Sequence, residues 1–130
     1  IISLHSPLTD ETRNMINAER LARMRPDAIV INTGRGGLID ADALGAALRE
    51  GRIAGAGLDT FAQEPPAADH PFWSEPRLVM TPHIGGVTTA ANERVGVDAA
   101  QGIIDVLAGR PVPPARIVNH AALSAAHVKA

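Results

Sequence analysis

Residues 28–37 read Ala28-Ile29-Val30-Ile31-Asn32-Thr33-Gly34-Arg35-Gly36-Gly37. The unbroken aliphatic run predicts a strand with helices over both faces of its sheet, as is typical of parallel sheets. The glycines after it predict a turn whose backbone a ligand can approach closely. Asp40 then predicts the N-cap of a helix that ends at Gly51. This stretch therefore predicts one strand–turn–helix unit of an α/β fold.

The same pattern repeats on both sides of that unit. Further apolar runs, at residues 1–4, 53–58 and 78–80, alternate with segments of helical period. Asn17 predicts the cap of a short helix, and a longer helix is expected from Thr88 or Thr89 to Gly109. The whole alternation predicts a parallel α/β sheet.

Composition limits the classes of partner. The chain has 130 residues, a formal net charge of −2 and no cysteine, with acidic and basic residues interspersed. This balance gives no reason to expect nucleic acid or an anionic membrane as a partner. No apolar run approaches the length of a membrane span, and the first residues lack the pattern of a signal peptide. We expect a soluble, cytoplasmic protein. The apolar strand-like opening predicts that this is a piece of a longer protein.

Three strand ends carry the polar residues. They are residues 32–37, 59–77 and 81–86, and the second contains four prolines and no helical period. A connection of that length without regular structure is uncommon in a compact domain and often functional. The carboxyl ends of parallel strands also form the edge where open α/β sheets bind ligands. We therefore expect these three segments to converge on one site.

Chemistry at that edge depends on a few side chains. Arg35 lies between glycines, and its planar guanidinium suits a carboxylate, although an isolated arginine is most often a solvated surface residue. His83 lies between a proline and a pair of glycines and titrates near neutral pH. Glu64 or Asp59 could stand beside it and make it a proton carrier. The alternative is an ordinary loop histidine beside an unrelated Glu-Pro turn.

Two other chemistries find no support in the sequence. The five histidines show no metal-ligand spacing, so we predict no metal site. No Gly-x-Ser-x-Gly motif is present for a serine nucleophile.

Several motifs together resemble the D-isomer-specific 2-hydroxyacid dehydrogenase family. They are Leu4-His5-Ser6-Pro7-Leu8-Thr9, Ile31-Asn32-Thr33-Gly34-Arg35-Gly36-Gly37-Leu38-Ile39-Asp40, Gly55-Ala56-Gly57-Leu58-Asp59-Thr60-Phe61 with Glu64-Pro65, and Thr81-Pro82-His83-Ile84-Gly85-Gly86. The resemblance covers roughly residues 1–119, and the phosphoglycerate dehydrogenase and hydroxypyruvate/glyoxylate reductase branch is the most similar. It implies the C-terminal part of a Rossmann-like, doubly wound parallel sheet, incomplete without an upstream βαβ unit.

The resemblance also implies roles. Arg35 would bind the substrate carboxylate, His83 would carry the proton while a nicotinamide carries the hydride, and Glu64 would pair with His83. The cofactor is expected to be NAD, with NADP as the alternative, and the substrate a small 2-hydroxy or 2-oxo acid. The residues expected to line the cofactor are Ser6, Pro7, Thr12, Thr33, Gly34, Arg35, Asp59, His83, Gly85 and Gly86.

The resemblance leaves alternatives and implies an absent part. A formate dehydrogenase-like enzyme would use a glutamine beside the histidine, and Gln63 is adjacent to Glu64. A non-catalytic NAD-binding module of the corepressor type would keep the same three residues. Residues 1–109 are expected to form part of the NAD-binding domain, and 110–130 a tail returning to a substrate domain. We expect a homodimer when the protein is intact, and little activity from this piece alone.

Overall fold

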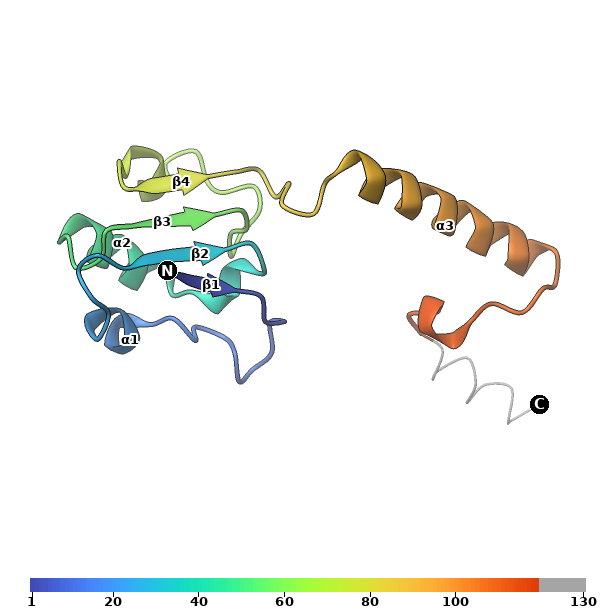
Figure 1. The fold of residues 1–130 in the computed structure, drawn as a ribbon, viewed down its shortest axis with the longest axis horizontal. Helices are drawn as coiled ribbons and strands as arrows, with labels where there is room; N and C mark the ends of the chain where they lie inside the picture. The colour runs from blue at the N-terminus through green and yellow to red at the C-terminus, as the bar shows by residue number, and fades with distance from the viewer. Residues whose placement is uncertain (120–130) are drawn as a thin grey trace. The chain divides into compact units, whose positions relative to one another are not determined.

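Residues 1–119, which the computed structural model describes, contain a four-stranded parallel sheet (Figure 1). The strands lie side by side in chain order, and β2 pairs with β3 from Ile29 opposite Gly55 to Asn32 opposite Leu58. Their bounds are β1 Ile2–Leu4, β2 Ile29–Asn32, β3 Gly55–Leu58 and β4 Leu78–Met80. The predicted parallel α/β sheet is confirmed.

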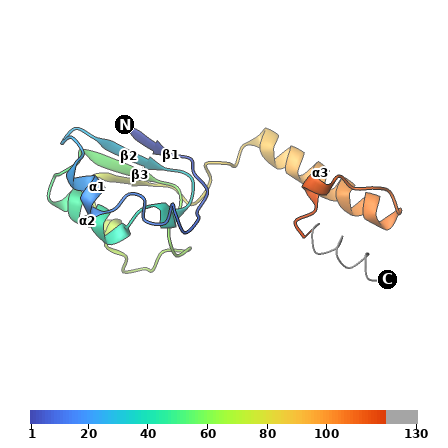
Figure 2. The same ribbon diagram turned by 90° about the horizontal axis from the view of Figure 1, so that it is seen from below.

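Two helices lie beneath one face of this sheet (Figure 2). They are α1 (Ala18–Ala22) and α2 (Ala41–Arg49). Val30 and Asn32 of β2 point toward that face and are buried, whereas Ile29 and Ile31 point the other way and are half-buried. The second helical layer expected from the aliphatic run is therefore not part of residues 1–86.

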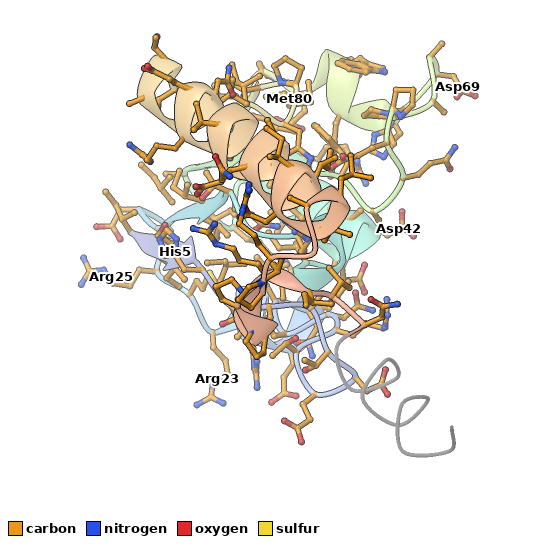
Figure 3. All side chains as sticks on the ribbon, turned by 90° about the vertical axis from the view of Figure 1, so that its right-hand side faces the viewer. His5, Arg23, Arg25, Asp42, Asp69 and Met80 are labelled. Carbon is orange, nitrogen blue, oxygen red and sulfur yellow. The ribbon has the colours of Figure 1, made fainter. Side chains whose placement is uncertain are left out.

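The apolar side chains in the core between the sheet and these helices are aliphatic except for Phe72. Leu21 of α1 and Leu44 and Leu48 of α2 are almost completely buried there. The other buried apolar residues are Leu4, Ile16, Val30, Leu38, Ile39, Ala47, Ile53, Ala56, Leu58, Phe72 and Leu78. Charged side chains lie outside it: Arg23, Arg25 and Asp69 project from the surface in Figure 3.

The helices begin at the residues that the sequence predicts. The side chain of Asn17 accepts a hydrogen bond from the backbone N–H of Arg20 at 3.1 Å, and Asp40 accepts one from Ala43 at 3.0 Å. These bonds satisfy N–H groups that the first turn of a helix leaves without a partner. Gly51, with a φ of +66°, follows the end of α2.

Loss of the Asp40 cap is expected to destabilise the fold. Asp40→Ala removes the acceptor for Ala43 and should lower the free energy of unfolding by about 1 kcal/mol. Asp40→Asn keeps an oxygen at that place and serves as the matched control. Denaturant unfolding followed by circular dichroism measures both, and equal stabilities for the two variants would contradict the capping role.

Residues 87–119 belong to a second unit, because their contacts are mostly with one another and not with residues 1–86. Its helix α3 (Thr89–Leu107) begins at Thr88, whose hydroxyl accepts a hydrogen bond from Ala91 at 3.1 Å. The predicted apolar stripe of α3 contributes Ala99, Gly102, Ile103 and Val106 to a hollow that the segment after the helix also lines.

Part of the expected tail lies outside the described residues, namely 120–130. The domain boundary expected at residue 109 stays a prediction for the intact protein. Among the described helices, none combines the length and the hydropathy that a membrane span requires.

Candidate active site

The segments that follow β2, β3 and β4 meet at the C-terminal edge of the sheet. A Cβ placed on Gly36 would overlap the backbone of Phe61 and Ala62, so these two main chains are in direct contact. A Cβ placed on Gly85 would lie 2.8 Å from a carboxylate oxygen of Asp59. The prediction that three strand ends converge is confirmed.

Glu64 and His83 form a hydrogen-bonded pair at this edge. His83 Nδ1 lies 2.8 Å from Glu64 Oε2, and Glu64 Oε1 accepts a hydrogen bond from the N–H of Phe61 at 2.9 Å. Both carboxylate oxygens are thus engaged, and the side chain of Glu64 is held in place. Sequence spacing left Glu64 and Asp59 as alternatives for the partner of His83, and the family resemblance implied Glu64. The geometry agrees with the resemblance.

The surroundings of Glu64 favour its ionised form. The hydrogen bond with His83 lowers the pKa of Glu64, and the hydrogen bond from Phe61 and the charges of His83 and Arg35 lower it further. Glu64 is therefore ionised at neutral pH. The carboxylate at this position fixes the orientation of the His83 ring through the contact at Nδ1. The other ring nitrogen, Nε2, has no hydrogen-bond partner among residues 1–119.

Asp59 is not the partner of His83, and its carboxylate binds the segment around that histidine instead. Its carboxylate is buried and accepts hydrogen bonds from the Thr81 hydroxyl at 2.5 Å and from the N–H groups of Ile84 and Gly85 at 2.8 and 2.7 Å. These donors, with the Thr81 hydroxyl first, lower the pKa of Asp59 despite its burial. Asp59 thereby ties the residues on both sides of His83 to the end of β3.

The lowered pKa of Asp59 determines how this residue affects the stability of the fold at different pH values. The ionised Asp59 contributes stability that is present above the unfolded pKa of an aspartate, about 3.9, and is lost as the pH falls through the lower folded pKa. At neutral pH the clamp on the His83 segment is therefore complete.

Arg35 lies near the pair without a hydrogen bond to it. Its side chain is exposed, and Nη1 donates to the carbonyl of Gly34 at 2.8 Å. Its charge nevertheless contributes to the lowered pKa of Glu64. The three predicted catalytic residues thus share one edge, and the guanidinium is accessible to an anion.

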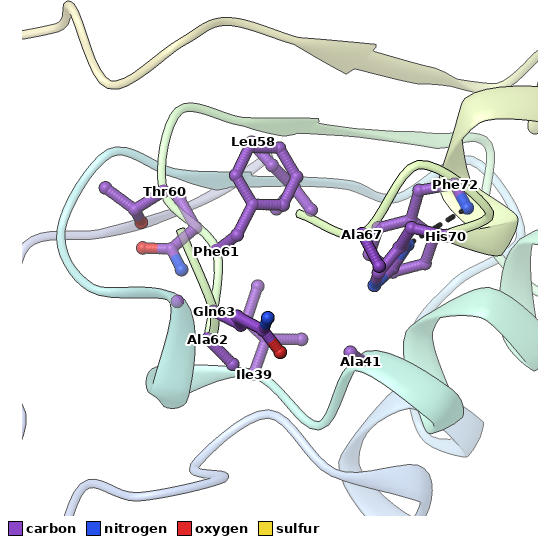
Figure 4. Close-up of a pocket in the computed structure, with 12 residues that line it drawn as sticks. Ile39, Ala41, Leu58, Thr60, Phe61, Ala62, Gln63, Ala67, His70 and Phe72 are labelled. Atoms are coloured by element: carbon purple, nitrogen blue, oxygen red, sulfur yellow. Dashed lines mark hydrogen bonds between the residues drawn. The ribbon is translucent and has the colours of Figure 1, made fainter. Parts of the chain in front are cut away.

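Two hollows adjoin this edge. One, of about 370 Å³, is lined by Glu64 and His83 together with apolar side chains that include Phe61, Trp73 and Met80. Both side chains of the pair remain partly exposed to solvent, so water screens part of the interaction between them. Gln63 lines the other, a hollow of about 150 Å³ that also contains His70 (Figure 4). Glu64, not Gln63, is thus the partner of His83.

The other residues expected to line a cofactor lie on segments that follow the strands at the same edge. Ser6 and Pro7 follow β1, and the Thr12 hydroxyl donates to the carbonyl of Pro7 at 2.7 Å. Thr33 lies across from Gly85, and the space around Gly86 is open. Because glycines leave the backbone bare here, a cofactor can approach it closely, and the individual cofactor contacts stay predictions.

Two site residues were given no role from the sequence. Asn32 is completely buried on the core face of β2, and Thr81 donates to Asp59. A polar residue at the core-facing end of a predicted strand is the signal that could have identified Asn32. No group of three metal-binding side chains occurs in the part of the chain that the structure describes.

Known proteins resemble this chain in sequence and in fold. Residues 1–85 match the sequence model described as D-isomer specific 2-hydroxyacid dehydrogenase, NAD binding domain. A glyoxylate reductase of Thermofilum pendens is 47% identical over 117 residues, which are 90% of this chain and 34% of that protein. A D-3-phosphoglycerate dehydrogenase of Mycobacterium leprae is 45% identical over 88% of this chain and 21% of its own length.

Solved structures agree with these relatives. The TT0316 protein of Thermus thermophilus superposes with a TM-score of 0.80 at 46% identity, covering 85% of this chain and 35% of that one. TP0037 of Treponema pallidum, a D-lactate dehydrogenase, gives 0.78 at 34% identity and covers 85% and 37%. The chain thus spans between about a fifth and little more than a third of the length of these proteins. It belongs to the D-isomer-specific 2-hydroxyacid dehydrogenase family, whose NAD-binding domain it matches over residues 1–85.

Proposed function

We propose that the intact protein is an oxidoreductase that transfers a hydride between NAD(H) and a small D-2-hydroxy acid or its 2-oxo acid. The observation that carries the proposal is the 2.8 Å contact between His83 Nδ1 and Glu64 Oε2. It leaves Nε2 of a histidine that can be protonated available at the edge where the family binds its cofactor. Membership of the family supports the reaction type.

In the direction of reduction, Arg35 binds the carboxylate of the 2-oxo acid through its guanidinium. A nicotinamide bound at this edge would supply the hydride for C2. His83 donates the proton from Nε2 to the carbonyl oxygen at C2, and the charge of Glu64 stabilises the ring while it is protonated. The products are the 2-hydroxy acid, the oxidised cofactor and a neutral His83, which takes a proton back from water. Oxidation runs through the same groups in reverse.

The geometry bears on the formate dehydrogenase alternative. That alternative requires a glutamine beside the histidine, and Gln63 lines a different hollow from the one that contains His83. A corepressor-type module that binds NAD without turnover keeps the same pair of residues. Only a measurement of turnover distinguishes such a module from the proposed reductase.

The test follows NADH absorbance in the intact protein with glyoxylate, hydroxypyruvate, phosphohydroxypyruvate, pyruvate and, in the oxidising direction, formate. Oxidation of NADH that depends on a 2-oxo acid is the expected result. NADPH in parallel measures the choice of cofactor. A protein that binds NADH and turns over none of these compounds would be a binding module. The 130-residue chain alone should be nearly inactive, because positioning supplies about 7–11 kcal/mol of barrier lowering and requires both sides of a cleft.

Glu64→Gln should change the pH dependence of reduction. The amide keeps a hydrogen bond to His83 but carries no charge, so it no longer favours the protonated ring. We expect the alkaline limb of the kcat/KM profile for the 2-oxo acid to move to lower pH. Glu75→Gln is the control, because the carboxylate of Glu75 accepts a hydrogen bond from the N–H of Arg77 and has none with His83. A profile that is unchanged in Glu64→Gln would contradict the role of the carboxylate.

The remaining expectations concern the setting of the enzyme. We propose a homodimer in the cytoplasm that acts on a small molecule, not on nucleic acid or a membrane. Size-exclusion chromatography with light scattering on the intact protein measures the oligomeric state.

A further inference from the structure

Asn32 is a polar side chain in an apolar place. It lies at the C-terminal end of β2 on the same face as Val30, and none of its surface is exposed. Its neighbours on that face of the sheet include Leu58, which stands opposite it in β3. Burial of an amide without hydrogen bonds costs a few kcal/mol, so packing alone would favour an aliphatic residue here.

Both hydrogen bonds of the Asn32 side chain end on the turn that carries Arg35. Oδ1 accepts the N–H of Gly34 at 3.0 Å, and Nδ2 donates to the carbonyl of Arg35 at 2.9 Å. The Arg35 carbonyl also accepts the N–H of Leu38 at 3.1 Å. Two donors from different directions therefore fix this carbonyl, and with it the direction in which the side chain of Arg35 leaves the backbone.

The turn is also tied to the other side of the site. The backbone carbonyl of Asn32 accepts the N–H of Asp59 at 2.9 Å, and Asp59 in turn holds Ile84 and Gly85. Asn32 thus links the turn of Arg35 to the segment of His83 through a chain of hydrogen bonds.

We propose that Asn32 is the positioning residue for Arg35: its buried amide sets the turn from which the guanidinium reaches the substrate carboxylate. This inference rests on the proposed function, because it assumes that Arg35 binds a carboxylate. An amide is required because the turn presents one donor and one acceptor to a single side chain. Aspartate has the same shape and lacks the donor that the Arg35 carbonyl needs.

Two variants of the intact protein test it. Asn32→Asp keeps the shape and loses the donor, and Asn32→Leu keeps apolar packing and loses both bonds. We expect kcat/KM for the 2-oxo acid to fall by about tenfold to a hundredfold, mainly through KM, as for other small displacements of a binding group. KM for NADH should rise less than KM for the 2-oxo acid, although the same turn is also expected to line the cofactor. A loss of stability alone would not raise KM for one substrate selectively in the fraction that remains folded.

A matched control comes from the same residue type. The side chain of Asn17 only accepts a hydrogen bond, from Arg20 at 3.1 Å, so Asn17→Asp should leave both kinetic constants unchanged. Hydrogen exchange of the Gly34 amide reports on the turn directly and should accelerate in both Asn32 variants. Unchanged KM for the 2-oxo acid in the two variants would overturn the proposal, whatever the exchange rate.

Failure of the proposed function is distinguishable from failure of this inference. If the wild-type protein turns over no 2-oxo acid, oxalate serves as the carboxylate probe and its dissociation constant is measured by calorimetry. Weaker oxalate binding in both Asn32 variants would then support the role of Asn32, although the proposed enzymatic activity would be contradicted. Equal binding would overturn the inference, and a wild-type protein that neither reacts nor binds oxalate would overturn both.

Discussion

His83→Gln in the intact protein should lower kcat for reduction of the 2-oxo acid by about 10²- to 10⁴-fold, the usual contribution of a positioned general acid. Glutamine keeps a polar side chain of similar length that can still hydrogen-bond Glu64, but it cannot give up a proton at neutral pH. Binding of NADH should change much less than kcat, although His83 is also expected to line the cofactor. Steady-state kinetics with NADH absorbance and a fluorescence titration of NADH measure the two quantities.

The control for this prediction is another histidine of the same unit. His70 Nδ1 accepts the N–H of Phe72 at 3.2 Å, and His70 lines the hollow that does not contain His83 (Figure 4). His70→Asn keeps an acceptor for Phe72 and should retain normal turnover. A kcat within a factor of about three of wild type in His83→Gln, far from the loss expected of a general acid, would remove His83 from the role of proton carrier.

Gly36→Ala should give the largest loss of stability among single glycine substitutions in residues 1–86. A Cβ at Gly36 would overlap the backbone carbonyl of Phe61 and the backbone nitrogen of Ala62. Main chain cannot turn aside as a flexible side chain can, so the segments after β2 and β3 must separate. We expect the free energy of unfolding to fall by about 1–3 kcal/mol or more.

The same substitution should separate Arg35 from Glu64 and thereby reduce turnover. Gly86→Ala is the stability control, because no atom lies within 4 Å of a Cβ built there. Denaturant unfolding compares the two variants. If Gly36→Ala is as stable as Gly86→Ala, the segments after β2 and β3 do not make the close contact described above.

Local signals account for most of the fold that the sequence predicts. Asn17, Asp40 and Thr88 all cap the helices that were expected to begin there. Capping and apolar periodicity involve residues within one turn or one strand of each other, so the sequence displays them directly. The second helical layer was expected from the apolar runs at residues 28–31 and 53–58, and residues 1–86 do not contain it.

The site depends on contacts that no local rule supplies. Glu64 and His83 are 19 residues apart, and Asp59 meets Ile84 and Gly85 across 25 and 26 residues. Whether Glu64, Asp59 or Gln63 stands beside His83 depends on how the long connection after β3 folds. Sequence spacing does not determine that path, because a connection with this number of residues, prolines and turns can follow many different backbone paths.

The sequence by itself determined the parallel α/β class, the helix starts, the family through its ordered motifs, and the edge at which Arg35, Glu64 and His83 gather. The family resemblance implied that Glu64 pairs with His83, and the tertiary structure shows the contact. The tertiary structure alone decided that Asp59 clamps the segment around His83 and that Asn32 holds the turn of Arg35. The physical reason is that strands and caps arise from neighbours along the chain. The partner of a polar side chain is instead chosen by which donors and acceptors the folded backbone brings within about 3 Å.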